Sequence, residues 1–202
     1  MGGTPARNQY LKIKSQYPNA ILFFQMGDFY ETFDEDAHII AKELQITLTS
    51  REMGKGEKIP LAGIPVHALQ TYLTRLIRKN YKVAICDQIG DTRTSEKIVD
   101  REVLRVVTPG TVIDDSMLDS RTNNYLASVF IKNDIAGLTY VDITTSEFLT
   151  TQIQVSELKS EMERILPAEI LVPLGVSLEK LGISKQTTEI DSELFNLDKM
   201  KI

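Results

Sequence analysis

The chain has 202 residues, of which 42% are hydrophobic and 25% charged, and its formal net charge is −5. This length allows one large or two small domains. No apolar run approaches the roughly 18 residues of a membrane span, so we expect no membrane contact. A single cysteine excludes an internal disulfide and a zinc site built on several thiolates.

Residues that bind metal ions are sparse. Cys86 ends the apolar run Val83-Ala84-Ile85 and is expected to be a buried, inert thiol. His38 and His67 fall in different predicted helices, each without a second ligand at metal spacing. We therefore expect no metal site and no catalytic residue.

Charge is distributed unevenly along the chain. Residues 1–113 carry 15 Lys and Arg against 13 Asp and Glu, whereas 114–202 carry 8 against 15, so the two parts have net charges of +2 and −7. Only the first part suits contact with phosphates, and its excess is small. DNA binding by this part must then depend on local basic side chains and on insertion between bases.

The first half of the chain alternates predicted helices and strands. Helical spacing of apolar residues predicts helices over 4–17, 33–44 and 69–77. Short apolar runs predict strands at 20–25, 47–49, 82–86 and 102–107. The two glycines and mixed charges of residues 51–58 predict an exposed loop. Residues 59–65 are expected to lead into the third helix. This order indicates a small α/β domain with a mixed sheet at 1–113.

The second half begins with a polar linker, 114–123, and then changes character. Alternating residues predict three meandering strands over 125–130, 136–143 and 147–153. A helix with Leu158, Met162 and Ile165 on one side and a strand at 169–172 follow. This is the opening pattern of a ribonuclease-H-like α/β domain. We place that domain at 124–202 and expect it to be truncated at Ile202.

The hexapeptide Gly27-Asp28-Phe29-Tyr30-Glu31-Thr32 directly follows an apolar run. It sets an aromatic ring and a carboxylate two residues apart, where both can project from the fold and disturb a base stack. From spacing alone a structural explanation is the favoured one. Asp28 and Glu31 fit a capping box at the start of the next helix, with Phe29 covering the helix end.

Several blocks give the chain a resemblance to MutS, the DNA mismatch repair family. The stretch Phe24 to Glu31 is similar to the mismatch-sensing strand of that family, with its Gly-Asp-Phe-Tyr-Glu signature. Four further blocks stand in the family's order and spacing: Leu48–Arg51, Pro60–Ala68, Ala84–Gln88 and Val107–Thr111. Residues 136–143 resemble a core strand of the family's connector domain. The resemblance thus implies a mismatch-recognition domain followed by a connector domain.

The resemblance also implies roles for individual residues. The intercalating aromatic falls on Phe29, entering from the minor groove at a mispaired or unpaired base, and the carboxylate that probes the base falls on Glu31. Basic side chains that could hold the DNA backbone are Arg51, Lys55, Lys58, His67 and Arg105. A role as a helix cap explains His67 equally well. Exposed lysines and arginines are commonly only solvated and contact no ligand.

Partners and cofactors follow from the same resemblance. Mismatched double-stranded DNA is the implied ligand, and a MutL-like repair protein is the implied partner of the connector domain. The phosphate loop Gly-x-x-x-x-Gly-Lys-Ser/Thr does not occur in the sequence, so ATP and Mg²⁺ are expected only in an ATPase domain outside this chain. We expect a cytoplasmic, bacterial-type protein, nucleoid-associated when DNA is bound. The chain is expected to be monomeric, and the full-length protein a homodimer and a DNA-dependent ATPase.

Two alternatives remain open. In a ribonuclease-H-like domain Asp142 stands where nucleases place a metal-binding carboxylate, with Asp134 and Glu147 nearby in sequence. A metal-dependent nuclease is therefore one alternative. The other is a protein-interaction module, since the charge of −7 in the second half suits a basic partner.

Overall fold

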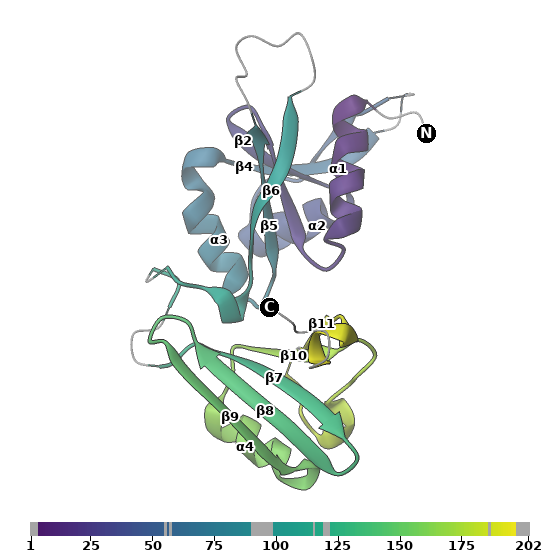
Figure 1. Cartoon of the computed structure of the whole chain (residues 1–202). Helices are drawn as coiled ribbons and strands as arrows, with labels where there is room; N and C mark the ends of the chain where they lie inside the picture. The colour runs from purple at the N-terminus through teal and green to yellow at the C-terminus, as the bar shows by residue number, and fades with distance from the viewer. Residues whose placement is uncertain are drawn as a thin grey trace. The chain divides into compact units, whose positions relative to one another are not determined.

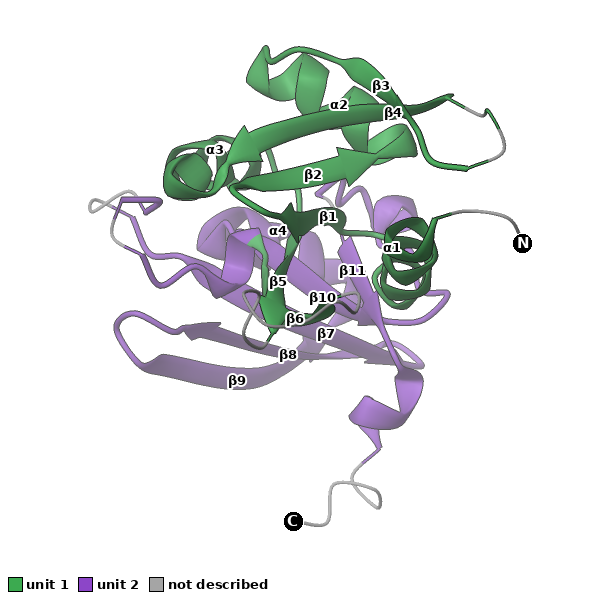
Figure 2. Ribbon diagram, turned by 90° about the horizontal axis from the view of Figure 1, so that it is seen from above, with its two compact units in different colours: residues 1–108 green, residues 109–202 purple. Residues whose placement is uncertain are grey.

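The structure is a computed structural model that describes residues 4–54, 56, 58–89, 99–114, 116–118, 122–185 and 187–196. The chain divides into two compact units, Met1–Thr108 and Pro109–Ile202, coloured separately in Figure 2. Each unit is described by itself. No helix in the described part of the chain is both long enough and apolar enough to cross a membrane. The predicted domain bounds 1–113 and 124–202, with the linker 114–123 between them, stay a prediction.

Unit 1 combines three α-helices with a six-stranded sheet (Figure 1). The helices are α1 (Pro5–Gln16), α2 (Asp34–Leu44) and α3 (Leu69–Ile77), with a short 3-10 helix, η1 (Val66–Ala68). The strands are β1 (Ile21–Met26), β2 (Phe29–Phe33), β3 (Thr49–Glu52), β4 (Lys58–Pro65), β5 (Val83–Ile89) and β6 (Asp100–Val107). The mixed α/β class predicted from the sequence is confirmed.

The strands of unit 1 lie in the order β3-β4-β2-β1-β5-β6. Only β1 and β5 are parallel, and every other neighbouring pair is antiparallel. Figure 1 shows α1 and α3 on opposite sides of β5 and β6. Because successive residues of a strand point to opposite faces, β1 is apolar on both faces, and its first four residues are all buried. This buried strand is the support from which the β1–β2 hairpin extends.

The start of β1 is fixed by a buried carboxylate from α2. Asp36 accepts a hydrogen bond from the amide of Leu22 at 3.0 Å and pairs with Lys14 Nζ at 2.9 Å. The Tyr10 hydroxyl also contacts it, at 3.3 Å. A buried charge is tolerated when it is paired and hydrogen-bonded in this way. Asp36 therefore joins α1, β1 and α2 into one rigid body.

Two parts of the sequence prediction for unit 1 are wrong. Residues 59–65 were expected to lead into a helix, but they form most of β4, the strand between β3 and β2. The expected strand at 47–49 lies two residues later as β3, and it takes Arg51 and Glu52 out of the predicted loop. The prolines of β4 obscured it, because proline is rare in central strands. Pro60 lies where β4 pairs with the edge strand β3, and Pro65 ends the strand.

Unit 2 has a five-stranded sheet in the order β11-β10-β7-β8-β9. The strands are β7 (Tyr125–Lys132), β8 (Ile135–Asp142), β9 (Glu147–Gln154), β10 (Glu169–Pro173) and β11 (Thr187–Ile190). The helices are α4 (Leu158–Ile165) and the 3-10 helices η2 (Pro109–Thr111), η3 (Val155–Glu157), η4 (Glu179–Leu181) and η5 (Ser192–Phe195). Three antiparallel strands followed by two parallel ones is the ribonuclease-H-like order, as predicted.

The core of unit 2 lies between α4 and one face of its sheet. Leu158, Met162 and Ile165 of α4 pack on alternate residues of β7 and β8, among them Val129 and Leu138. The helix ends at Leu166, which adopts a left-handed conformation with φ 47°. The i, i+4, i+7 spacing that predicted this helix thus corresponds to its buried side.

Gly110 in η2, within the block Val107–Thr111, meets a packing requirement. A Cβ at this position would lie 2.8 Å from Glu169 Cβ and 2.8 Å from Leu126 Cδ1. Its amide donates to Glu169 Oε2 at 3.2 Å. The backbone therefore approaches β7 and β10 at a distance that only glycine permits.

Candidate nucleic-acid interface

The hairpin of β1 and β2 presents the candidate site. Gly27 and Asp28 alone connect the strands, and Met26 pairs with Phe29 directly across the turn. Gly27 has φ +62°, in the left-handed region that favours glycine. The sharp reversal turns residues 29–33 back along β1 as a strand. The capping-box interpretation of Asp28 and Glu31 is therefore wrong: α2 begins only at Asp34, and its N-cap, Phe33, makes no side-chain capping bond.

The tip of this hairpin is held on both sides. On the β4 side, the amide of Val66 donates to the Asp28 carbonyl at 2.9 Å. On the β5 side, the Gln25 side chain accepts from the amide of Gln88 at 2.9 Å, and Arg101 Nε donates to the Gln25 carbonyl at 2.6 Å. Tethering of a two-residue turn from both neighbours leaves it little freedom to move.

Phe29 is the exposed residue of an otherwise buried strand. Its exposed fraction is 47%, whereas the four residues that follow it in β2 are buried. Leaving such a ring half in water forgoes about 1 kcal/mol of burial energy. The other phenylalanines of the hairpin, Phe23, Phe24 and Phe33, are all in the core. The ring therefore projects from a rigid support, as the sequence predicted for this residue.

Glu31 does not project, contrary to the expectation from its spacing. The residue is 9% exposed, and its Oε2 accepts from Arg51 Nη1 at 2.9 Å. Burial raises the pKa of the Glu31 carboxyl above its usual value, and the positive charges of Arg51 and Arg101 only partly offset this effect. Alternation still places Phe29 and Glu31 on the same face of the sheet.

Gly63 of β4 lies directly opposite Glu31 in the register. A Cβ at this position would lie 3.1 Å from the Tyr30 carbonyl oxygen and 3.6 Å from Glu31 Cγ. The absence of a side chain on β4 leaves room for the carboxylate beside the strand. Sequence reasoning noted the block Pro60–Ala68 but gave this glycine no role.

Arg101 is a second residue that sequence reasoning missed. Its guanidinium lies 4.7 Å from the centroid of the Phe24 ring and donates to Gln9 Oε1 at 3.0 Å and to the Val99 carbonyl at 2.9 Å. These contacts join α1, β1 and β6 beside Glu31. The sequence gives no signal for these contacts, because an arginine in a strand is usually solvated.

The four predicted phosphate contacts that the structure describes do not gather in one place. His67 is exposed in η1, two residues after Pro65, which pairs with Phe29, so it lies near the hairpin tip. Lys58 begins β4 at the other end of that strand, about 23 Å away along seven residues. Lys55 lies outside the described residues.

Arg51 and Arg105 occupy opposite faces of the sheet. Arg51 is on the edge strand β3 and pairs with Glu31. Arg105 on β6 lies opposite Ile85 and close enough to Tyr30 to affect the pKa of its hydroxyl. Since Tyr30 alternates with Phe29 and Glu31, Arg105 is on the face away from them. The structure thus places Arg51, but not Arg105, on the face of the sheet that carries Phe29 and Glu31.

Two of the three carboxylates of the nuclease alternative, Asp142 and Glu147, accept hydrogen bonds from protein groups. Asp142 accepts from the Thr144 hydroxyl at 2.6 Å and from the amides of Asn124 and Thr144, each at 2.9 Å. Burial raises its pKa, but these hydrogen bonds outweigh that effect and hold the pKa below its usual value. Glu147 lies opposite Asp142 and accepts from the Tyr125 hydroxyl at 2.7 Å. Asp134 lies beyond the other end of β8.

Within the described ranges, no group of three His, Cys, Asp or Glu side chains is placed to hold a metal ion. Cys86 is buried, and burial raises the pKa of its thiol to about 12. At neutral pH such a thiol stays protonated and unreactive. Asp142 and Glu147 therefore act as structural hydrogen-bond acceptors, and the nuclease alternative receives no support from the geometry of the described residues.

In the comparison with known proteins, two family models match successive parts of the chain. The family model for MutS domain I matches residues 4–116, and that for MutS domain II matches residues 124–199. The DNA mismatch repair protein MutS of Dehalococcoides mccartyi strain CBDB1 is 52% identical over 196 residues, covering 96% of this chain and 23% of that protein.

Archaeal proteins with the same name are similarly close. MutS of Methanothrix thermoacetophila is 50% identical over 196 residues, covering 96% of this chain and 22% of the relative. MutS of Methanosarcina barkeri is 52% identical over 186 residues, covering 84% and 21%. The chain thus spans less than a quarter of the length of these curated relatives.

Proposed function

The chain belongs to the MutS family, with domain I followed by domain II, and on that premise we propose that it reads mismatches in double-stranded DNA. In this proposal the Phe29 ring enters a base step from the minor groove, and the Glu31 carboxyl contacts the base that the ring disturbs. The observation that carries the proposal is the half-exposed ring of Phe29 on a tethered two-residue turn.

The energetics of insertion explain how a wedge can select mismatches. Opening a base step of matched DNA costs a few kcal/mol, whereas a mispaired or unpaired base is already poorly stacked and kinks more easily. Stacking of the ring on the displaced base returns about 1–3 kcal/mol. Since the return is similar everywhere, the lower opening cost at a mismatch decides where Phe29 inserts.

The carboxyl of Glu31 adds a second criterion. An ionised carboxylate near phosphates is repelled, and this repulsion weakens binding to DNA that offers it no hydrogen bond. A displaced base can donate to the carboxylate, or accept from the carboxylic acid. The raised pKa of Glu31 favours the acid form. Loss of Glu31 should therefore strengthen binding to matched DNA.

Backbone contacts near the tip are proposed for two residues only. His67 is exposed close to Phe29, and Arg51 is half exposed on the edge strand of the same sheet. Lys58 and Arg105 lie at the far end of β4 and on the opposite face, so we assign them no phosphate. These assignments fit the small positive excess of the first half of the chain.

The test is a titration of mismatched and matched duplexes of the same length at one low salt concentration. Phe29→Ala is made in the longest form of the protein that carries this chain, and fluorescence anisotropy gives both dissociation constants. We expect the ratio of the two constants to approach one. The matched control is Phe148→Ala, which removes a 66% exposed ring from β9 in unit 2 and should leave the ratio unchanged. An unchanged ratio for Phe29→Ala rejects the assignment.

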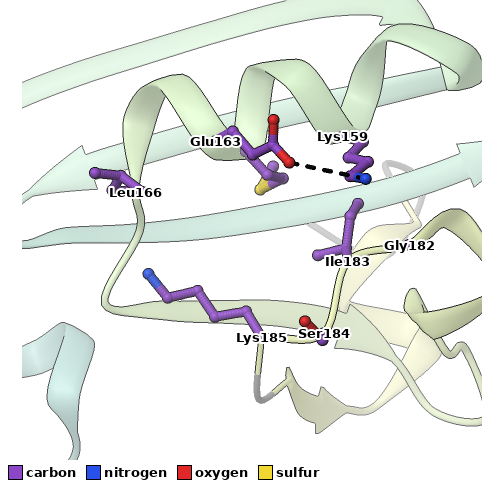
Figure 3. Close-up of a pocket in the computed structure, with 8 residues that line it drawn as sticks. Lys159, Glu163, Leu166, Gly182, Ile183, Ser184 and Lys185 are labelled. Atoms are coloured by element: carbon purple, nitrogen blue, oxygen red, sulfur yellow. Dashed lines mark ion pairs between the residues drawn. The ribbon is translucent and has the colours of Figure 1, made fainter.

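We also propose that unit 2 receives a protein partner, of the MutL-like kind that the family resemblance implies. A hollow of about 310 Å³ lies between α4 and residues 182–185 (Figure 3). Met162 and Ile183 line it, and Leu166 at its edge is 68% exposed. Lys159 and Lys185 extend along it from opposite sides. An apolar side chain flanked by a carboxylate would fit this arrangement.

Cross-linking to a MutL homologue tests this second proposal. Leu166→Asp and Lys185→Glu should each abolish the cross-link, because one places a charge beside the apolar floor and the other reverses a charge there. The control Lys180→Glu changes an exposed lysine in η4 and should have no effect. If only charge reversal of acidic residues in 134–202 abolishes it, the partner binds elsewhere on unit 2.

A further inference from the structure

The carboxyl that is proposed to contact the base is held by another side chain. Arg51 Nη1 donates to Glu31 Oε2 at 2.9 Å, and the side chains are 47% and 12% exposed, respectively. Because β4 lies between β3 and β2 in the sheet, Arg51 must reach across β4 to make this contact. The pair therefore joins a surface cation on an edge strand to a nearly buried anion.

The two arginines near Glu31 differ in their freedom to leave it. Arg101 is committed to the Gln25 carbonyl, to Gln9 and to the face of Phe24. Arg51 is half exposed, and all four residues of its strand are exposed. A guanidinium that is already half in water loses little hydration when it turns to another anion, so the cost of the exchange falls on the carboxyl that it leaves. Arg51 is then the mobile member of the arrangement.

DNA supplies a competing anion for this arginine. The planar guanidinium binds phosphate oxygens and carboxylate oxygens with the same geometry. Arg51 lies on the same face of the sheet as Phe29, the residue proposed to enter the minor groove, and backbone phosphates line that groove. Approach of the duplex thus brings phosphates toward the side chain that holds Glu31.

We infer that Arg51 is a specificity-determining residue that exchanges the Glu31 carboxylate for a DNA phosphate, and that this exchange releases Glu31 to the base. The inference rests on the proposed mismatch reading. On matched DNA the exchange leaves the partly buried Glu31 carboxyl without a hydrogen-bond partner. The cost of this unpaired group opposes binding. At a mismatch the displaced base replaces Arg51 as its partner, so the cost disappears.

The exchange also links mismatch reading to protonation. The charged groups near Glu31 are Arg51 from β3 and Arg101 from β6, and Phe24 of β1 and Gly63 of β4 add no charge. Departure of Arg51 removes the nearer positive charge, so the released carboxyl retains its proton to higher pH. A protonated Glu31 is no longer repelled by phosphates, and it can donate a hydrogen bond to a base nitrogen.

A double-mutant cycle tests the exchange. Arg51→Ala, Glu31→Gln and the double variant are titrated with mismatched and matched duplexes in the longest form of the protein. In Arg51→Ala, Glu31 lacks its partner before DNA binds, so the penalty on matched DNA is lost. The mismatch preference should then fall by at least about fivefold, the upper end for a surface ion pair, because Glu31 is nearly buried. In the Glu31→Gln background the same substitution should leave the preference unchanged.

Two control variants and a pH series separate this role from simpler ones. Arg51→Lys retains one donor and one charge and should restore most of the preference. Lys58→Ala removes a neighbouring exposed charge and should leave the preference unchanged. The mismatch preference of Arg51→Ala, measured from about pH 4 to pH 8, a range that brackets the usual pKa values of carboxyl and imidazole groups, should change at higher pH than in the wild type.

Two results would overturn the inference. Equal weakening of both duplexes by Arg51→Ala, in both backgrounds, makes Arg51 an ordinary phosphate contact. A lower melting temperature without rescue by Arg51→Lys makes the ion pair structural. Either result leaves Phe29 untouched, whereas a Phe29→Ala variant that retains its mismatch preference rejects mismatch reading itself, so the two failures are distinguishable.

Discussion

The hydroxyl of Tyr30 on β2 donates to Asp87 Oδ1 on β5 at 2.6 Å and so spans the intervening strand β1. The Tyr30 ring is also stacked on Phe23, with centroids 6.1 Å apart. Burial, reinforced by Asp87, raises the pKa of Tyr30. This bond fixes the strand that carries Phe29 and Glu31 from the face opposite to them.

Removal of that hydroxyl should weaken unit 1. Tyr30→Phe leaves Asp87 without its donor, and we expect a loss of about 1–2 kcal/mol in the free energy of unfolding. Urea denaturation measures it. Tyr72→Phe in α3 is the control, because the ring contact with Arg75 is retained in that variant. Equal stability of wild type and Tyr30→Phe would show that the bond contributes nothing.

Truncation of two phenylalanines in the same strand, β2, should change the free energy of unfolding by very different amounts. Phe29→Ala should change stability by less than about 1 kcal/mol, since the ring is already half in water. Phe33→Ala removes a ring that is 1% exposed, and it should cost about 3–5 kcal/mol. Chemical denaturation of the two variants compares them directly. A large loss for Phe29→Ala contradicts an outward-facing ring.

The carboxyl of Glu31 should make stability depend on pH. Its pKa is raised in the folded chain, relative to an ordinary value near 4.5. The folded state then binds the proton more tightly, so this contribution is fully present below pH 4.5 and is lost as pH rises through the raised value. Unfolding of the wild type and of Glu31→Gln across this range should show the wild type losing stability relative to the variant. A relative gain would mean that the arginines dominate.

Close packing at Gly110 should be intolerant of a methyl group. Gly110→Ala places a Cβ 2.8 Å from two neighbouring atoms of unit 2, and overpacking of this kind costs about 1–3 kcal/mol. Gly137→Ala in β8 is the control, because its Cβ would meet only the Phe130 carbonyl at an ordinary 3.7 Å. Thermal unfolding distinguishes them. Similar melting temperatures for the two variants would contradict the contact.

Much of the fold could be predicted because its signals are local. The apolar face of α2 is visible in the spacing of Phe33, Ala37, Ile40 and Leu44, and β1 and β5 are short buried runs. β4 was missed because Pro60 and Pro65 oppose a strand on local grounds. Pairing with β2 and β3, which depends on residues far along the chain, overrides that preference.

The candidate site divides in the same way. Gly27 predicts a turn, so the aromatic residue that follows this turn, Phe29, can be expected at the tip of the hairpin. Withdrawal of Glu31 could not be predicted, because it depends on Arg51, which is 20 residues away and separated from it by β4. Nor does the sequence reveal that the acids of β8 and β9 are consumed by turn amides and by a tyrosine.

The amide of Val66 that ties down the Asp28 carbonyl has a mechanical consequence. A hairpin that is to insert only where a base step opens easily must be stiffer than that step, because otherwise the hairpin and not the DNA would deform. A two-residue loop that is hydrogen-bonded to η1, directly after β4, can deform very little. In the proposed function, deformation is thereby left to the nucleic acid, where its energetic cost differs between matched and mismatched pairs.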